Sequence, residues 1–204
     1  MGNSRSSRTL RYARRMARDA KILEVAADLF RKRGFAAVGV DEIGKAAGVT
    51  GPAIYRHFKG KDEILGALFD EGMDEIVRVT AGSFEDPWEE LRHAATQHAL
   101  HVLHNPRLAG IWLHEGRSLT DEHRRRYFRR ARKYVERWSD VLERCLPDAD
   151  DDVILTAVYS TIGALNSVDA WPKAIKDDAH VELLVDMVVG AVRALEPEAA
   201  RSAA

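Results

Sequence analysis

The residues best suited to chemistry lie in a short stretch that ends at Lys61. Ile54 and Phe58 are four residues apart, so one short helix would bury both and leave its other side chains outside. An arginine on the outer side of such a helix can donate two parallel hydrogen bonds to a guanine edge, and a small neighbour can contact a thymine methyl group. These residues therefore predict contacts with base edges and phosphates of duplex DNA. The outer residues are Thr50, Gly51, Ala53, Arg56 and His57.

Two short helices joined by a tight turn are expected to position these residues. Gly48 can adopt the left-handed conformation that ends a helix, Thr50 can cap the next helix, and the first turn of that helix tolerates Pro52. Val40–Lys61 is thus predicted to be a helix-turn-helix, whose second helix enters the major groove. A simple packing corner between two helices is the alternative for this stretch alone. The apolar stripe of the first helix consists of Ile43, Ala46 and Ala47.

The flanking sequences make this prediction more specific. Ile22–Phe35 precedes the helix-turn-helix and Lys61–Gly72 follows it. Together, residues 22–65 closely resemble the N-terminal domain of TetR-family transcriptional regulators. The matching residues are Ala26, Ala27, Leu29, Phe30, Gly34, Ile43, Ala47, Gly48, Val49, Tyr55, Phe58 and Lys61.

The resemblance implies an all-α homodimer whose C-terminal body binds a small molecule and whose last two helices form a four-helix dimer interface. It also implies that the effector releases double-stranded operator DNA by favouring a body conformation that does not fit the DNA. No cofactor is implied. By position, the residues expected to contact bases or adjacent phosphates are Thr50, Gly51, Ala53 and Arg56. Those expected to contact phosphates are Tyr55, His57 and Lys61.

Two departures from the family pattern affect the expected DNA contacts. Gly39 stands where the family often has a Ser or Thr that caps the first of the two short helices, so a cap and a phosphate contact are expected to be lost. Gly51 and Pro52 replace more polar residues at the front of the recognition helix. Base recognition is then expected to depend on Arg56, on methyl contacts and on DNA shape.

Charge is distributed unevenly along the 204 residues. Residues 1–61 hold 14 Lys and Arg against 5 Asp and Glu, a net charge of +9, whereas residues 62–204 hold 17 against 27, a net charge of −10. A basic head suits a polyanion and an acidic body avoids it elsewhere. The single cysteine, Cys145, excludes an intramolecular disulfide and fits a reducing cytoplasm. No run of apolar residues is expected to reach the length of a membrane span, and no membrane partner is predicted.

The chain is predicted to be all-α, with about nine helices in two domains. Residues 1–18 are expected to form a flexible basic arm, 19–65 the DNA-binding domain, 66–196 the ligand-binding and dimerisation domain, and 197–204 a flexible tail. The arm carries several arginines that could contact phosphates or enter the minor groove. The first helix is expected to start at about Asp19, and a long helix is expected to start at Lys61.

Two terminal helices predict a dimer. Residues 153–168 and 178–195 are apolar on nearly every side, which requires cover on every side. A second subunit is the simplest cover, and small residues along these helices permit close approach. The residues expected at the interface are Val158, Gly163, Val181, Leu184 and Val188.

The body is expected to hold an apolar pocket, because all four tryptophans and most long apolar stretches lie there. Ordinary core packing predicts the same residues, and a drug, a fatty acyl thioester, a steroid-like molecule and a flavonoid all fit this composition. A DNA-bound dimeric scaffold without a small-molecule ligand is the alternative function. The residues expected to line the pocket are His101, Trp112, Tyr134 and Asn166.

Other constellations are weak. The motif from Glu90 to His93 is half of a di-iron site, and no nucleophile elbow, phosphate loop or zinc signature occurs, so the chain is not expected to be an enzyme. Three histidines at positions 98, 101 and 104 could bind a metal, but core or surface histidines are the favoured interpretation. The arginine run between Arg124 and Arg137 is either a second nucleic-acid surface or, as favoured, a solvated face paired with nearby acids.

Overall fold

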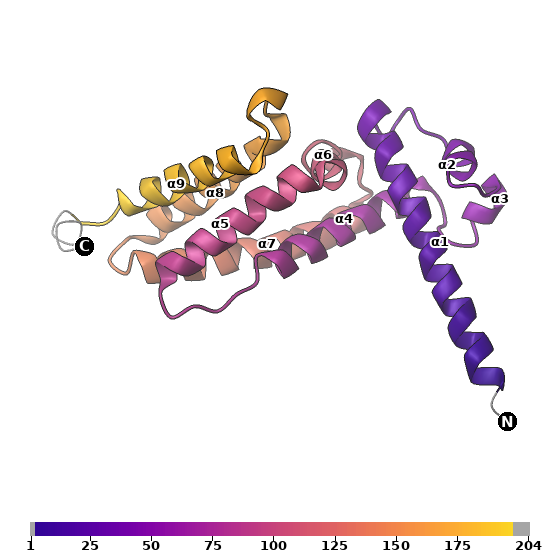
Figure 1. Ribbon diagram of the computed structural model, residues 1–204, viewed down its shortest axis with the longest axis horizontal. Coiled ribbons are helices and arrows are strands. Elements are labelled where there is room, and N and C mark those ends of the chain that lie inside the picture. The colour runs from indigo at the N-terminus through magenta and orange to yellow at the C-terminus, as the bar shows by residue number, and fades with distance from the viewer. Residues whose placement is uncertain (1–2, 198–204) are drawn as a thin grey trace. The chain divides into compact units, whose positions relative to one another are not determined.

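The computed structural model describes residues 3–197, and it describes side chains from residue 13 onward. Within this part of the chain there are nine α-helices and no strands, as the helical periodicity predicts (Figure 1). The helices are α1 (Asn3–Arg33), α2 (Val40–Ala46), α3 (Gly51–Ile54), α4 (Lys61–Val79), α5 (Pro87–His104), α6 (Pro106–His114), α7 (Asp121–Cys145), α8 (Asp151–Asn166) and α9 (Asp178–Arg193). The all-α prediction is confirmed.

Two side-chain caps and a glycine define several helix ends. The Asp86 carboxylate accepts a hydrogen bond from the Trp88 amide at 2.9 Å and starts α5. The Asp177 carboxylate accepts one from the His180 amide at 3.0 Å and starts α9. Gly34 ends α1 with a φ of 78°, a left-handed conformation that favours glycine.

The first helix differs from the prediction. It begins at Asn3 rather than near Asp19, so the expected arm is helical from Asn3 onward. The expected start relied on apolar periodicity, which is absent before Asp19. Residues 3–18 contain neither proline nor glycine and several arginines, which are good helix formers. Residues 1–2 and the predicted tail from 198 onward lie outside the described residues.

The helices divide into two compact units. The first unit comprises the chain up to Glu71 together with Gly110–Arg124, and the second comprises Gly72–Ala109 and the chain from Arg125 onward. The first unit buries one core between α1, α2, α3 and α4. Its most completely buried side chains are Ile22, Ala26, Phe30, Ile43, Ile54, Ile64 and Leu65.

The second unit is a helical bundle in which α5 packs against both α8 and α9 (Figure 1). Its core consists mainly of leucine, isoleucine and valine, with two aromatic residues of α7, Tyr134 and Trp138. The segment Asp151–Ala170 is long and apolar enough to cross a membrane by length and composition, with a mean hydropathy of 1.3, contrary to expectation. A core helix of a soluble protein passes the same test.

Candidate nucleic-acid interface

The turn between α2 and α3 has the geometry of a helix-turn-helix. Gly48 has a φ of 69°, which allows the chain to leave α2, and the Val49 amide donates to the Gly44 carbonyl at 2.9 Å. A Cβ atom at Gly44 would lie 3.1 to 3.3 Å from backbone atoms of Val49, Thr50 and Gly51. The absence of a side chain at Gly44 therefore lets α2 and α3 approach closely, a requirement that apolar periodicity could not reveal.

The N-caps of α2 and α3 make no side-chain hydrogen bond. Gly39 is the N-cap of α2, and glycine has no side chain that could cap the helix. Thr50 occupies the N-cap position of α3, but its side chain makes no cap hydrogen bond. In the first turn of α3, Pro52 has no amide hydrogen, and the Ala53 and Ile54 amides donate to the Thr50 carbonyl at 2.8 and 3.3 Å, so these residues offer no free amide to a phosphate. Close to it, Asp41 packs against Gly51, where a Cβ atom would lie 1.9 Å from the Asp41 Oδ1 atom.

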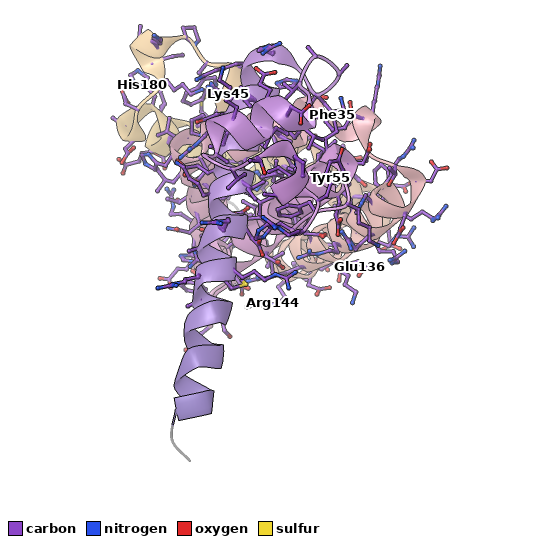
Figure 2. All side chains as sticks on the ribbon, turned by 90° about the vertical axis from the view of Figure 1, so that its right-hand side faces the viewer. Phe35, Lys45, Tyr55, Glu136, Arg144 and His180 are labelled. Carbon is purple, nitrogen blue, oxygen red and sulfur yellow. The ribbon has the colours of Figure 1, made fainter. Side chains whose placement is uncertain are left out.

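The outer face of α3 is narrower than the sequence predicts. Tyr55, which Figure 2 labels, is 59% exposed. Arg56 is also exposed and forms no ion pair with any described residue. Thr50 and Pro52 are also exposed. Ala53, in contrast, is only 6% exposed, so the prediction that it lies on the outer face is wrong. The helix is a single turn of four residues, and this length does not define a face by periodicity.

His57 connects the recognition helix to α1. Its Nδ1 atom lies 2.5 Å from the Asp19 Oδ1 atom, and the Arg15 Nε atom lies 3.9 Å from the other carboxylate oxygen of Asp19. His57 is half-buried as a result. The expected phosphate contact must therefore be made by the ring nitrogen that does not face Asp19.

The Lys61 side chain makes its contacts inside the first unit. Its ammonium donates to the carbonyl oxygens of Phe35, Ala36 and Val38 at 3.0, 3.4 and 3.2 Å, and it lies 4.4 Å from the centre of the Phe35 ring. An ammonium has three donors, so these three carbonyls use all of them. Lys61 thereby holds the loop between α1 and α2. This role inside the protein differs from the phosphate contact that the sequence predicts.

In the second unit, two of the predicted pocket residues meet at a histidine. The Tyr134 hydroxyl lies 2.9 Å from the His98 Nδ1 atom, and the Asn166 Oδ1 atom lies 3.0 Å from its Nε2 atom. His98 is 1% exposed, and burial lowers its pKa to about 4, so the ring is neutral at pH 7. The sequence favours a core or surface histidine at position 98 over a metal ligand, and nothing in it shows that Tyr134 and Asn166 lie beside the ring.

The other two predicted pocket residues are placed differently. His101 is buried and its Nδ1 atom lies 3.3 Å from the Asn105 amide nitrogen, while burial lowers its pKa. Trp112 belongs to the first unit, whereas His101, Tyr134 and Asn166 belong to the second. Among residues 3–197, no three His, Cys, Asp or Glu side chains gather in a way that could hold a metal ion.

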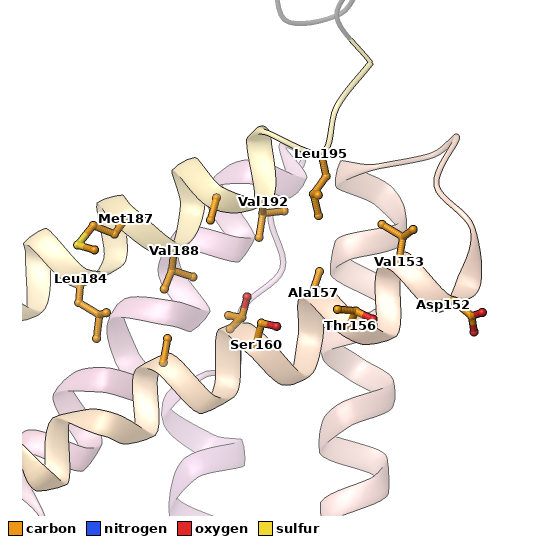
Figure 3. Close-up of a pocket in the computed structure, with 13 residues that line it drawn as sticks. Asp152, Val153, Thr156, Ala157, Ser160, Leu184, Met187, Val188, Val192 and Leu195 are labelled. Carbon is orange, nitrogen blue, oxygen red and sulfur yellow. The ribbon is translucent and has the colours of Figure 1, made fainter.

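A groove of about 670 Å³ runs between α8 and α9, and side chains of both helices line it (Figure 3). Its walls include Leu184 and Val188, which were predicted at the dimer interface, and none of the predicted pocket residues. Met187 and Leu195 in the same groove are 64% and 46% exposed. The groove is therefore an exposed apolar face of the second unit.

The structure corrects part of the predicted interface. Val158 and Val181 are 0% and 1% exposed within their own subunit, so the prediction that they contact a partner is wrong. Both point into the bundle, since a helix that is apolar all round does not reveal which face is internal. Gly163 is exposed, and a Cβ atom there would meet nothing within 4 Å. Large exposed apolar residues in this part of the chain are Val153, Leu155, Tyr159, Leu183, Met187 and Leu195, of which Val153, Met187 and Leu195 line the groove.

Both units match known protein families. Residues 22–68 match the family described as bacterial regulatory proteins, tetR family, and residues 85–174 match the tetracyclin repressor-like C-terminal domain. The chain is 26% identical over 155 residues to the transcriptional repressor KstR2 of Mycobacterium tuberculosis, covering 71% of this chain and 78% of KstR2. It is 38% identical over 76 residues to the transcriptional activator FasR of Mycolicibacterium smegmatis, covering 37% of this chain but only 33% of FasR.

Solved structures share the fold over most of the chain. A tetR-family regulatory protein from Rhodococcus RHA1 has a TM-score of 0.77 at 21% identity, covering 88% of this chain and 97% of that protein. AibR, in complex with isovaleryl coenzyme A and operator DNA, has a TM-score of 0.72 at 28% identity, covering 85% of this chain and 97% of AibR.

Proposed function

The chain belongs to the TetR family of transcriptional regulators, and we propose that it is a dimeric repressor that releases a palindromic operator when a small molecule binds its second unit. The observation that carries the proposal is the exposed surface at the end of α3, where Tyr55 and Arg56 follow the second helix of a helix-turn-helix whose turn contains Gly48 in a left-handed conformation. Recognition of a DNA duplex requires such an outward face and no catalytic group, so no enzymatic step is part of the proposal.

The dimer is supported by the groove between α8 and α9. One helix-turn-helix buries too little surface for tight and specific binding, so two heads must act together. The exposed apolar residues of α8 and α9 form a contiguous face of the kind that a second subunit covers. At Gly163 and Gly190 a Cβ atom would meet nothing within 4 Å, so a partner helix can approach closely there.

The effector site is proposed around His98. A hydrogen-bonded set of polar groups inside an apolar bundle is typical of sites that orient the polar part of a ligand. Tyr134 and Asn166 supply a hydroxyl and an amide beside the neutral imidazole. Since AibR is similar over most of this chain and binds isovaleryl coenzyme A, we take a short acyl coenzyme A thioester as the effector class.

The proposal is tested on operator sequences selected from a random duplex pool with the full-length protein. Isovaleryl coenzyme A should release the selected duplex, measured by fluorescence anisotropy, while coenzyme A alone should not. Tyr134→Phe should keep operator affinity and weaken the response to the thioester. If neither short nor long acyl thioesters change operator affinity, the proposed effector class is wrong. If no small molecule in a broad panel does, the DNA-bound scaffold becomes the better account.

A further inference from the structure

The middle of α7 concentrates the positive charge of the second unit. Residues 124–133, RRRYFRRARK, hold seven of the 17 Lys and Arg found after residue 61, and no Asp or Glu. The remaining ten are spread over a region that carries 27 acidic residues. A short basic segment in an otherwise acidic body is a localised electrostatic feature.

Part of this segment is neutralised within the protein. Arg124 lies 2.7 Å from the Asp121 carboxylate, and Arg130 pairs with Asp74. Farther along α7, Arg137 donates to the Thr80 carbonyl at 3.0 Å. The expectation of a face paired with nearby acids is confirmed for Arg124 and Arg130, whereas Arg137 contacts a backbone carbonyl instead.

Four further cations of α7 form, together with one aromatic residue, a separate basic face that consists of Arg125, Phe128, Arg129, Arg132 and Lys133. Its four cations are exposed and form no ion pair or hydrogen bond with any described residue. Spacings of three and four residues place them on one side of the helix, within about 12 Å along its axis. The Phe128 side chain is 60% exposed among them.

The basic face has two properties that are unfavourable for a surface that contacts only water. Like charges three or four residues apart, such as Arg125 with Arg129, destabilise a helix. A phenylalanine that is exposed to this extent places apolar surface in water, which is unfavourable in free energy, whereas a polar residue at the same position would not. Exposed aromatic residues beside arginines are enriched where proteins bind partners, and an anionic partner would also relieve the repulsion between the cations.

We propose that the basic face of α7 binds the sugar–phosphate backbone of duplex DNA outside the operator half-sites, without reading its sequence. The inference rests on the proposed function, because an operator-bound protein holds flanking DNA at high local concentration. Each phosphate that a cation neutralises releases condensed counterions, so a row of unpaired arginines on a helix suffices for such a contact. The acidic surroundings restrict DNA to this face.

A second copy of the chain is the competing occupant. The exposed acidic residues Asp148, Asp150, Asp151 and Asp152 could complement the basic face in another subunit. That contact would need no DNA and would change the size of the protein in solution. The proposed contact needs DNA and leaves the size of the free protein unchanged.

The test compares the wild type with R125E/R129E/R132E on a selected operator in a 24-base-pair duplex and in a 60-base-pair duplex with random flanks. The control R125K/R129K/R132K keeps the charge and the aliphatic stems. The neutral variant R125Q/R129Q/R132Q serves if the Glu variant loses its helical circular dichroism. For the wild type, the slope of log K against log salt should be steeper on the long duplex by about 0.9 per phosphate contacted, or about 2.7 for three phosphates.

Raising the salt from 50 to 200 mM should then reduce the advantage of the long duplex by roughly 40-fold. The Lys control should behave like the wild type, whereas the Glu and Gln variants should lose the length-dependent slope and keep their affinity for the short duplex. The proposal is overturned if these variants keep the wild-type slope difference, if they weaken both duplexes equally, or if light scattering shows a changed assembly without DNA.

If selection yields no operator, the proposed function fails and the same comparison is made on a random 60-base-pair duplex. There the Glu and Gln variants should have a smaller salt slope than the wild type. Equal slopes would overturn the inference independently of operator recognition.

Discussion

Replacing Lys61 with methionine separates a role inside the protein from a role on DNA. Methionine keeps an apolar stem of similar length and removes only the ammonium, so the carbonyls of Phe35, Ala36 and Val38 lose a charged donor. Hydrogen bonds to a charged group contribute about 1.5–3 kcal/mol each when well formed. Because the site is only half-buried and two of the bonds are 3.2 and 3.4 Å long, water replaces much of this contribution.

We therefore expect Lys61→Met to lower the free energy of unfolding of the first unit by about 2 kcal/mol, with about 0.5 kcal/mol of this from the lost contact with the Phe35 ring. Urea unfolding followed by circular dichroism measures the change. Lys59→Met is the matched control, because the Lys59 side chain is exposed, and it should change the unfolding free energy by less than about 0.5 kcal/mol.

The salt dependence of operator binding provides the second part of the assay. If Lys61 acts only through the loop, Lys61→Met leaves the slope of log K against log salt unchanged. If its ammonium neutralises a phosphate, the slope decreases by about 0.9. A variant of wild-type stability whose slope decreases by that amount would refute the internal role and restore the phosphate contact expected from the family.

Three further predictions concern the dimer, the buried histidine and base recognition. Met187→Asp places a charge in the exposed groove between α8 and α9, so light scattering should show a monomer. The control Val77→Asp on α4 should remain dimeric. A dimeric Met187→Asp protein would exclude this face as the interface. Because the pKa of His98 is lowered from 6.5 to about 4, the unfolded state takes up a proton first as the pH falls, so the second unit should lose about 2 kcal/mol between pH 7 and pH 5. His98→Gln should lack this pH dependence in urea unfolding, and an unchanged pH dependence would assign it to other groups. Arg56→Ala should relax the consensus obtained by binding-site selection, since an arginine contact to guanine contributes about 1–3 kcal/mol of discrimination, and an identical consensus would mean that Arg56 reads no base.

The sequence predicts the parts of the fold that depend on local patterns. Periodic apolar residues and Gly48 at the turn are local signals, and the two helices of the helix-turn-helix form where these signals indicate. The start of α1 escaped prediction because helix propensity without an apolar stripe leaves no periodic pattern.

The residues whose surroundings the sequence did not predict depend on tertiary contacts. Ala53 lies on a helix of one turn, too short for periodicity to assign a face. Lys61 donates hydrogen bonds to backbone carbonyls between residues 35 and 38, and His98 is hydrogen-bonded to side chains of α7 and α8. These partners are distant in the sequence. Val158 and Val181 share the composition of their exposed neighbours, so only the packed bundle shows which apolar face is internal.

Footprinting of the full-length protein on a selected operator, combined with the mass of the complex, tests the central proposal most directly. The account predicts two half-sites related by two-fold symmetry and protected together by one dimer, because each subunit carries one α3 face. Protection of a single asymmetric half-site by one subunit would contradict it.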